Sequence, residues 1–325
     1  MENNEQFTNR IDLSKLKESV GTIKSEIAKV IVGQDKMIEL LLTAILADGH
    51  ILLEGVPGVA KTLTAKLMAR IIDVDFSRIQ FTPDLMPSDI LGTSVFNLKT
   101  SEFEFKSGPI FTNIVLIDEI NRAPAKTQAA LFEVMEERQV SIDGQKFVME
   151  PPFITIATQN PIDQEGTYRL PEAQLDRFLF KISVGYPSLD EEILIIEGEH
   201  SRKHDPLADI KTILGAQEIA DYREKVASLH VDNHLMKYIA QIVHETRQNK
   251  SLFLGASPRA SLGILGAAKA LAAINGRDFV VPEDIKEVAL PVLGHRILLT
   301  PEKEMEGLGT AQVIEQIIDK IEVPR

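Results

Sequence analysis

One short stretch does most to limit how this chain can fold. An apolar run, Ile51–Leu53, leads into the loop GVPGVAKT at residues 55–62, and TLTAKLMARI continues from Thr62 as an amphipathic helix. A buried strand that turns through glycines into a helix gathers backbone N–H groups at the positive end of the helix dipole, which suits phosphate. Ala60 stands where the pattern G-x-x-x-x-G-K-[ST] has its second glycine. A plain Gly-Pro turn is therefore the alternative interpretation.

Several residues of the loop have distinct predicted roles. Gly55 and Gly58 give the backbone freedom to curl around phosphates, and Lys61 is expected to reach the β and γ phosphates. The Thr62 hydroxyl is expected on Mg²⁺, and Ala60 is tolerated if its dihedral angles are already helical. The predicted nucleotide-binding residues of this segment are Gly55, Val56, Pro57, Gly58, Val59, Ala60, Lys61, Thr62 and Leu63.

A second motif, NIVLIDEINRA at residues 113–123, is an apolar strand that ends in two acids. Acids at the carboxyl end of a parallel strand lie where such folds bind ligands. Asp118 is expected to hold Mg²⁺ through water, because a hard cation prefers oxygen ligands. Glu119 is expected to polarise the attacking water. Two acids after an apolar run are common, so this motif alone is a weak signal. Its position after the glycine loop, at the end of a predicted strand, strengthens the prediction.

Three more polar residues complete the candidate site. Asn160, in FITIATQNP, is expected to position the water or touch the γ-phosphate, although an asparagine before proline also suits a plain turn. Arg177, in LPEAQLDRF, and Arg259, in GASPRA, are candidates for contact with the γ-phosphate, with a surface salt bridge as the alternative for each.

The spacing of apolar runs predicts an α/β domain followed by helices. The strand candidates are 51–53, 79–81, 114–117, 153–157 and 179–184, and their continuous apolar character suits a parallel sheet buried on both faces. Residues 11–30 read as an amphipathic helix, and 91–111 and 137–150 read as inserted β-hairpins, the second around Asp143-Gly144. The strands stop near Pro187. We expect domains at 1–188 and 189–325, with helices near 190–200, 216–228, 232–249, 258–274 and 282–293.

Composition excludes several classes of function. The chain has no cysteine, so disulfides, zinc-thiolate sites and cysteine nucleophiles are ruled out. Its formal net charge of -13 argues against non-specific binding to nucleic acid or to acidic lipids. The polar start MENNEQFTNR lacks the apolar core of a signal peptide, and no run is long enough to span a membrane. A cytoplasmic location is therefore expected.

Taken in order, GVPGVAKT, VLIDEINRAP, TIATQNP, LPEAQLDRF and GASPRA resemble the MoxR family of AAA+ ATPases. The resemblance covers about residues 30–300, and alanine before the lysine is usual in this family's phosphate loop. It identifies the loop and the acidic strand end as Walker A and Walker B motifs. It implies a three-layer P-loop fold with a parallel sheet of order 5-1-4-3-2, inserted β-hairpins and a smaller all-helical lid.

The resemblance also implies roles and partners. Asn160 takes the place of sensor 1, Arg259 of sensor 2 and Arg177 of the arginine finger, while Val32 and Gly33 are expected to line the adenine pocket. The family implies ATP and Mg²⁺ as cofactors, a ring that is usually a hexamer, and chaperone-like remodelling of a protein. The implied partner carries a von Willebrand factor A domain and is expected on a separate chain. The two hairpins are expected to face the ring pore or this client.

Two alternative functions remain open at this point. Related AAA+ proteins with such inserts move on DNA, but the hairpins balance Lys99, Lys106 and Lys146 with Glu102, Glu104, Asp143 and Glu150, which is not basic enough to track a phosphate backbone. Metal insertion into a cofactor, as in chelatase subunits of this lineage, is the second alternative. The pairs His200/His204 and His230/His234 lack a third ligand of clear spacing, so surface histidines are the preferred interpretation.

Overall fold

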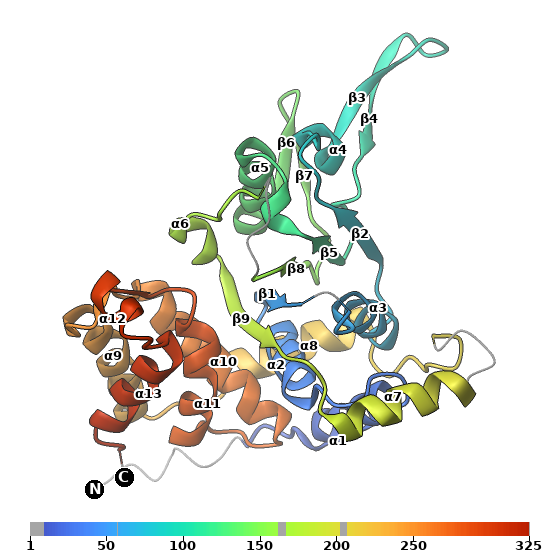
Figure 1. Ribbon diagram of the computed structural model, residues 1–325. Helices are drawn as coiled ribbons and strands as arrows, with labels where there is room; N and C mark the ends of the chain where they lie inside the picture. The colour runs from blue at the N-terminus through green and yellow to red at the C-terminus, as the bar shows by residue number, and fades with distance from the viewer. Residues whose placement is uncertain (1–9, 57, 162–166, 202–206, 325) are drawn as a thin grey trace, which may run out of the picture. The chain divides into compact units, whose positions relative to one another are not determined.

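The computed structural model describes residues 10–56, 58–161, 167–201 and 207–324 (Figure 1). These described residues divide into two compact units: those within 23–41 and 48–220, and those within 10–22, 42–47 and 221–324. The predicted boundary between residues 188 and 189 is the place where the strands of the main sheet end. The division into domains at this position stays a prediction, because residues on both sides of it belong to the same compact unit as the sheet.

The larger unit is built on a five-stranded sheet in which every neighbouring pair is parallel. Its spatial order is β2-β5-β8-β1-β9. Numbered along the chain and read from the β9 edge, this is 5-1-4-3-2, so the predicted order is confirmed. All five positions of β5 are buried, as expected for a strand covered on both faces. The strands are β1 (His50–Gly55), β2 (Phe76–Gln80), β5 (Ile114–Asp118), β8 (Ile154–Gln159) and β9 (Phe178–Val184).

Helices follow most of these strands. In α3 (Lys61–Ile71), the buried residues Thr64, Ala65, Leu67, Met68 and Ile71 recur at helical spacing, which explains why this segment packs as a helix after β1. The predicted N-terminal helix is present as α1 (Ser14–Ala28). The remaining helical elements up to residue 201 are α2 (Asp35–Leu46), α4 (Pro87–Leu91), η1 (Ile120–Arg122), α5 (Ala125–Glu137), α6 (Glu172–Leu175) and α7 (Leu189–Ser201).

Both predicted hairpins are present. One pairs β3 (Gly92–Asn97) with β4 (Glu102–Ser107), and the other pairs β6 (Gln139–Ile142) with β7 (Gln145–Val148). Asp143 and Gly144 have φ angles of 50° and 77°, the left-handed pair that a two-residue hairpin turn requires. The Phe105 and Phe147 rings lie 4.2 Å apart, and Ser94 donates a hydrogen bond to Asp143. The two hairpins therefore contact each other.

The predicted helices that follow residue 220 lie in the second compact unit, whereas the one near 190–200, observed as α7, belongs to the larger unit. The chain enters the second unit through α8 (Ala216–Ala227), followed by α9 (Asn233–Gln248), α10 (Pro258–Ile274) and α11 (Pro282–Leu293). Asp232 accepts a hydrogen bond from His234 N at 2.7 Å, and Ser257 accepts one from Arg259 N at 3.2 Å. These side chains satisfy backbone donors that a helix start leaves open, so Asp232 and Ser257 cap α9 and α10.

The expectation of an all-helical second domain needs one correction. A short antiparallel ribbon pairs β10 (Leu252–Leu254) with β11 (Leu298–Leu299). Segments of two and three residues carry too little periodicity to be recognised, and their pairing joins positions far apart in the chain. Two further helices, α12 (Pro301–Met305) and α13 (Thr310–Lys320), were not predicted. Among the residues that the structure describes, no helix combines the length and the hydropathy needed to cross a membrane.

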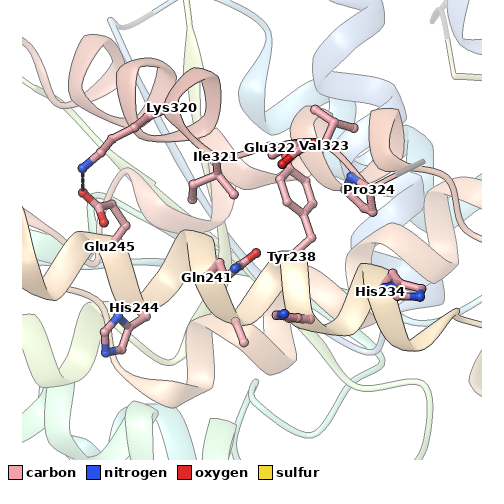
Figure 2. Close-up of a pocket in the computed structure, with 12 residues that line it drawn as sticks. His234, Tyr238, Gln241, His244, Glu245, Lys320, Ile321, Glu322, Val323 and Pro324 are labelled. Atoms are coloured by element: carbon pink, nitrogen blue, oxygen red, sulfur yellow. Dashed lines mark hydrogen bonds and ion pairs between the residues drawn. The ribbon is translucent and has the colours of Figure 1, made fainter.

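A cavity of about 830 Å³ lies beside α9 in this second unit (Figure 2). Its walls include Tyr238, His244 and the segment that follows α13, and Lys320 pairs with Glu245 at 2.5 Å. None of the residues predicted to bind nucleotide lines this cavity. It is therefore not the predicted site.

Candidate functional site

A second cavity, of about 390 Å³, lies at the carboxyl ends of the central strands. It is bounded by the end of β1 and the loop after it, the start of α3, and the ends of β2, β5 and β8. Parallel sheets bind ligands at this edge, so the position agrees with the prediction. The lining residues are Gly55, Gly58, Ala60, Lys61, Thr62, Leu63, Arg78, Gln80, Asp118, Glu119, Thr158 and Asn160.

The loop before α3 differs from expectation at Ala60. We expected helical dihedral angles, but Ala60 has φ 58° and ψ 16°, which is the left-handed conformation, and Gly58 has φ 89°. A side chain in that conformation costs about 1–2 kcal/mol. The Ala60 carbonyl compensates in part, because both the backbone N–H and the hydroxyl of Thr64 donate to it at 2.9 Å. The chain thus enters α3 through a strained turn that glycine would accept more readily.

Other predicted loop residues fall outside the lining of this cavity. Val56 is part-buried and Val59 is buried, and neither lines it. Pro57 lies outside the described residues.

Lys61 is a cation of the cavity that the sequence predicted. Its ammonium group donates a hydrogen bond to the Gly55 carbonyl, across the loop. Burial lowers the pKa of Lys61, and the negative charges of Asp118, Glu119 and Glu54 oppose that shift. An ammonium group in this position is partly stripped of water and faces carboxylates. It is therefore well placed to meet the oxygens of a polyphosphate.

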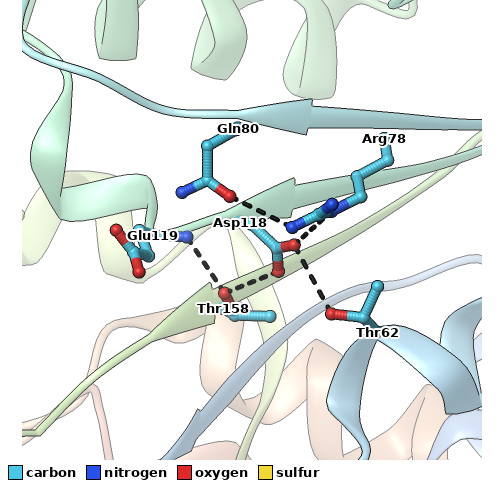
Figure 3. Close-up of polar contacts among 6 residues, drawn as sticks. All are labelled: Thr62, Arg78, Gln80, Asp118, Glu119 and Thr158. Atoms are coloured by element: carbon cyan, nitrogen blue, oxygen red, sulfur yellow. Dashed lines mark hydrogen bonds and ion pairs between the residues drawn. The ribbon is translucent and has the colours of Figure 1, made fainter. Parts of the chain in front are cut away.

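Asp118 forms the centre of a hydrogen-bonded group (Figure 3). Its Oδ1 accepts from the Thr158 hydroxyl at 3.1 Å, and its Oδ2 lies 3.4 Å from the Thr62 hydroxyl. The Thr158 oxygen also accepts from the backbone N–H of Glu119 at 3.0 Å. The Asp118 side chain is only 9% exposed. Thr158 therefore fixes both the carboxylate of one acid and the backbone of the next.

The donor atoms here fit a magnesium ion. Thr62 supplies a hydroxyl and Asp118 a carboxylate on adjacent elements, and hard divalent cations prefer such oxygens. No group of three or more histidine, aspartate and glutamate side chains able to hold a metal occurs in the described part of the chain. The protein ligands alone would not complete a coordination shell, which suits a cation that shares its ligands with phosphate and water.

Glu119 and Asn160 line the same cavity, as predicted. Glu119 follows β5 in the left-handed conformation with φ 57°. Its carboxylate is 42% exposed and pairs with Arg122 Nε at 2.9 Å. Asn160 directly follows β8. The structure therefore brings together the two strand-end residues that the sequence assigned to the attacking water.

Four further predicted residues, outside the loop, do not line this cavity. Arg177 pairs with Glu136 of α5 at 2.7 Å, and Arg259 belongs to the other compact unit. Gly33, next to Val32, has φ 70°, and a Cβ there would come within 2.2 Å of the Glu191 carboxylate. The roles of Arg177 and Arg259, and those of Val32 and Gly33 at the adenine, stay predictions.

Three lining residues were missed from the sequence: Arg78, Gln80 and Thr158. The predicted strand began at Ile79, one residue after Arg78, whereas β2 covers Phe76–Gln80. Arg78 and Gln80 are two residues apart on β2, so both point to the same face. This polar alternation near a strand end was the signal that could have identified them.

Comparison with known proteins agrees with this fold and site. Residues 50–180 match a family described as "ATPase family associated with various cellular activities (AAA)", and residues 244–318 match a family described as "AAA lid domain". A Mycobacterium tuberculosis protein named chaperone MoxR1 is 47% identical over 92% of this chain and 81% of its own length. The Bacillus subtilis protein YeaC, whose name calls it uncharacterized, is 45% identical over 94% of this chain and 95% of its own length.

A crystal structure of a Cytophaga hutchinsonii protein superposes on this chain with a TM-score of 0.89. That protein is described as a candidate ATPase. It is 42% identical, and the match covers 96% of this chain and 97% of that one. The sheet order, the strand-end cavity and the matched lid place the chain in the AAA class of P-loop proteins. Within that class, the chain belongs to the MoxR family of AAA+ ATPases.

The left-handed turn at Ala60 gives a stability prediction. Ala60→Val should lower the free energy of unfolding by about 1–3 kcal/mol, because a β-branched residue is poorly accommodated at positive φ. Ala60→Gly should change it by less than about 1 kcal/mol, since relief of strain is offset by the entropy of the unfolded chain. Urea denaturation followed by circular dichroism measures both changes.

The matched control is Ala129→Val, at an exposed position of α5. It should cost about 0.5 kcal/mol from helix propensity alone. Equal losses at residues 60 and 129 would contradict the assigned loop conformation.

Proposed function

We propose that this protein binds ATP with Mg²⁺ in the 390 Å³ cavity and hydrolyses it to drive work on a protein partner. One observation carries the proposal: Lys61, Asp118, Glu119 and Asn160, from three separate segments, line one cavity at the ligand-binding edge of the sheet. Lysine at the start of a helix, paired acids and an amide are the groups that phosphoryl transfer to water needs.

Each residue has a task that its position supports. The first turn of α3 offers backbone N–H groups to the phosphates, and Lys61 neutralises charge on the β and γ phosphates. Thr62 and Asp118 would hold Mg²⁺, whose chemistry is to neutralise charge that develops on the phosphate oxygens. Glu119 would orient the attacking water and draw its proton, while Asn160 would position that water.

The proposed reaction is the hydrolysis of ATP. The water oxygen bonds to the γ-phosphorus, the bond from that phosphorus to the β–γ bridging oxygen breaks, and the products are ADP and phosphate. The ion pair with Arg122 uses Oε2 of Glu119, so the water would meet Oε1 or displace Arg122. This pair is about half exposed on each side, so breaking it costs little.

Assembly belongs to the same proposal. In a ring, which family resemblance makes a hexamer, Arg177 would act as an arginine finger on the nucleotide of a neighbouring subunit. Arg259 would act as sensor 2. Val32 and Gly33 would contact the adenine. The Arg177 side chain is 28% exposed and its partner Glu136 is 37% exposed. Such a pair is weak enough to be exchanged for a phosphate.

The hairpins favour a protein as the partner. Leu98 and Phe103 of the β3–β4 hairpin are 86% and 74% exposed, and Phe96 is also exposed. Exposed apolar side chains that gather at one place mark contacts with proteins more often than with nucleic acid, whose backbone calls for basic groups. By family resemblance, the partner would carry a von Willebrand factor A domain.

Glu119→Gln tests the hydrolytic step. The variant should bind ATP but hydrolyse it at least about 100-fold more slowly, because glutamine cannot accept the proton of the attacking water. Phosphate release measured at saturating ATP gives the rate. Glu133→Gln, at an exposed position of α5, is the matched control and should keep normal turnover. Near-normal turnover in Glu119→Gln would remove this residue from catalysis.

The same variant tests the nature of the partner. Loaded with ATP, Glu119→Gln should capture a protein from lysate of the source cells, and nuclease should not release it. Adding Phe103→Ser should reduce the capture, whereas adding Leu262→Ser, which alters an exposed leucine of α10, should not. Recovery of nucleic acid that disappears on nuclease treatment would contradict the protein-remodelling function.

A further inference from the structure

One carboxylate oxygen in the cavity, Asp118 Oδ2, contacts two polar side chains. In the proposed function this oxygen and Thr62 would hold a metal ion, so the oxygen could not also keep its bond from Arg78. Asp118 Oδ2 accepts from Arg78 Nε at 2.6 Å and lies 3.4 Å from the Thr62 hydroxyl (Figure 3). The other oxygen, Oδ1, is engaged by Thr158 at 3.1 Å. Arg78 therefore holds the oxygen that faces Thr62.

Asp118 needs a cation beside it. Its side chain is 9% exposed, and a buried carboxylate is costly unless it is paired and hydrogen-bonded. The short bond from Arg78 is charge-assisted, which makes it stronger than a bond between neutral groups. Arg78 thus places a positive charge beside the buried Asp118 carboxylate at the end of β5.

Arg78 is held much less firmly than Asp118. Its side chain is 48% exposed, and its second contact is a bond from Nη2 to Gln80 Oε1 at 3.2 Å. It stands on β2, which forms one edge of the sheet. A long, partly solvated side chain on an edge strand can swing away while the buried carboxylate stays in place.

We propose that Arg78 is the resident counter-ion of Asp118 in the metal-free protein and that it sets how strongly nucleotide binding depends on Mg²⁺. The inference rests on the proposed function, which gives Asp118 and Thr62 to the metal ion. When the Asp118 carboxylate binds a metal ion, Arg78 releases Oδ2. The Arg78 guanidinium group then stays at the cavity wall. In that position it can pair with phosphate oxygens.

Arg78 should matter most for nucleotide binding in the absence of metal. With Arg78 in place, Asp118 is neutralised, so a polyphosphate can enter the cavity with little repulsion. Without Arg78, the bare carboxylate lies close to Lys61 and the phosphate positions, and it repels the incoming charge. With Mg²⁺ present, the metal replaces the missing positive charge. Removing Arg78 should therefore weaken metal-free binding far more than metal-dependent binding.

The experiment measures the dissociation constant of a fluorescent ADP analogue in EDTA and in excess Mg²⁺. The quantity of interest is the ratio of the EDTA value to the Mg²⁺ value. Arg78→Gln should raise this ratio at least about tenfold, because the unneutralised Asp118 carboxylate repels the phosphates only in the metal-free state. Arg70→Gln removes one positive charge from an exposed position of α3 and should leave the ratio as in the wild type.

Arg78→Lys keeps the charge but loses the planar guanidinium, so its ratio should lie between those of the wild type and Arg78→Gln. It carries the test alone if circular dichroism shows that Arg78→Gln does not fold. An unchanged ratio in the folded Arg78 variants would overturn the assignment to Arg78 and leave the proposed function standing. Failure of the wild-type chain to bind the analogue under either condition would overturn both.

Discussion

The nucleotide cavity depends on one buried negative charge. Asp118 ends a strand whose residues are all buried, and a buried carboxylate is costly unless donors surround it. Thr62, Arg78 and Thr158 supply those donors from three different elements. The need to satisfy this carboxylate thus holds α3, β2 and β8 in register around the end of β5. The same need creates the place where a divalent cation fits.

Conformational strain lies on both sides of that charge. Ala60 enters α3, and Glu119 leaves β5, each in the left-handed conformation with φ near 58° and 57°. Strained backbone persists where the surroundings determine it, and such positions gather at functional sites. At Ala60 the bonds from Thr64 hold the turn, and at Glu119 the Thr158 hydroxyl holds the backbone N–H. Two threonines therefore stabilise the conformations in which the loop and the candidate catalytic acid are presented.

Much of this could be predicted from the sequence, because the strand-end residues follow directly from local patterns. An apolar strand before a glycine loop placed Lys61 and Thr62, and apolar strands ending in polar residues placed Asp118, Glu119 and Asn160. Arg78 could not be found in this way. Its ion pair joins positions 40 residues apart, and it exists because β2 lies next to β5 with Gln80 opposite Asp118. Sheet order sets that register, and local periodicity does not contain it.

The other differences have similar causes. The conformation of Ala60 could not be inferred, since alanine has no preference for positive φ and only the closed loop imposes it. The β10–β11 ribbon pairs Leu252 with Leu299, and neither short segment shows a strand pattern on its own. For the ribbon, the missing information is a contact between distant parts of the chain; for Ala60, it is the closure of the loop between Gly55 and Lys61.

The central claim is that the loop at residues 55–62 is the nucleotide site, and titration calorimetry of ATP with Mg²⁺ tests it most directly. The account predicts that the wild-type chain binds one ATP per subunit and that Lys61→Ala loses this binding, because the cavity loses its ammonium group. Lys66→Ala, at an exposed position further along α3, should bind as the wild type does. Tight binding retained by Lys61→Ala, with the same stoichiometry, would contradict the account.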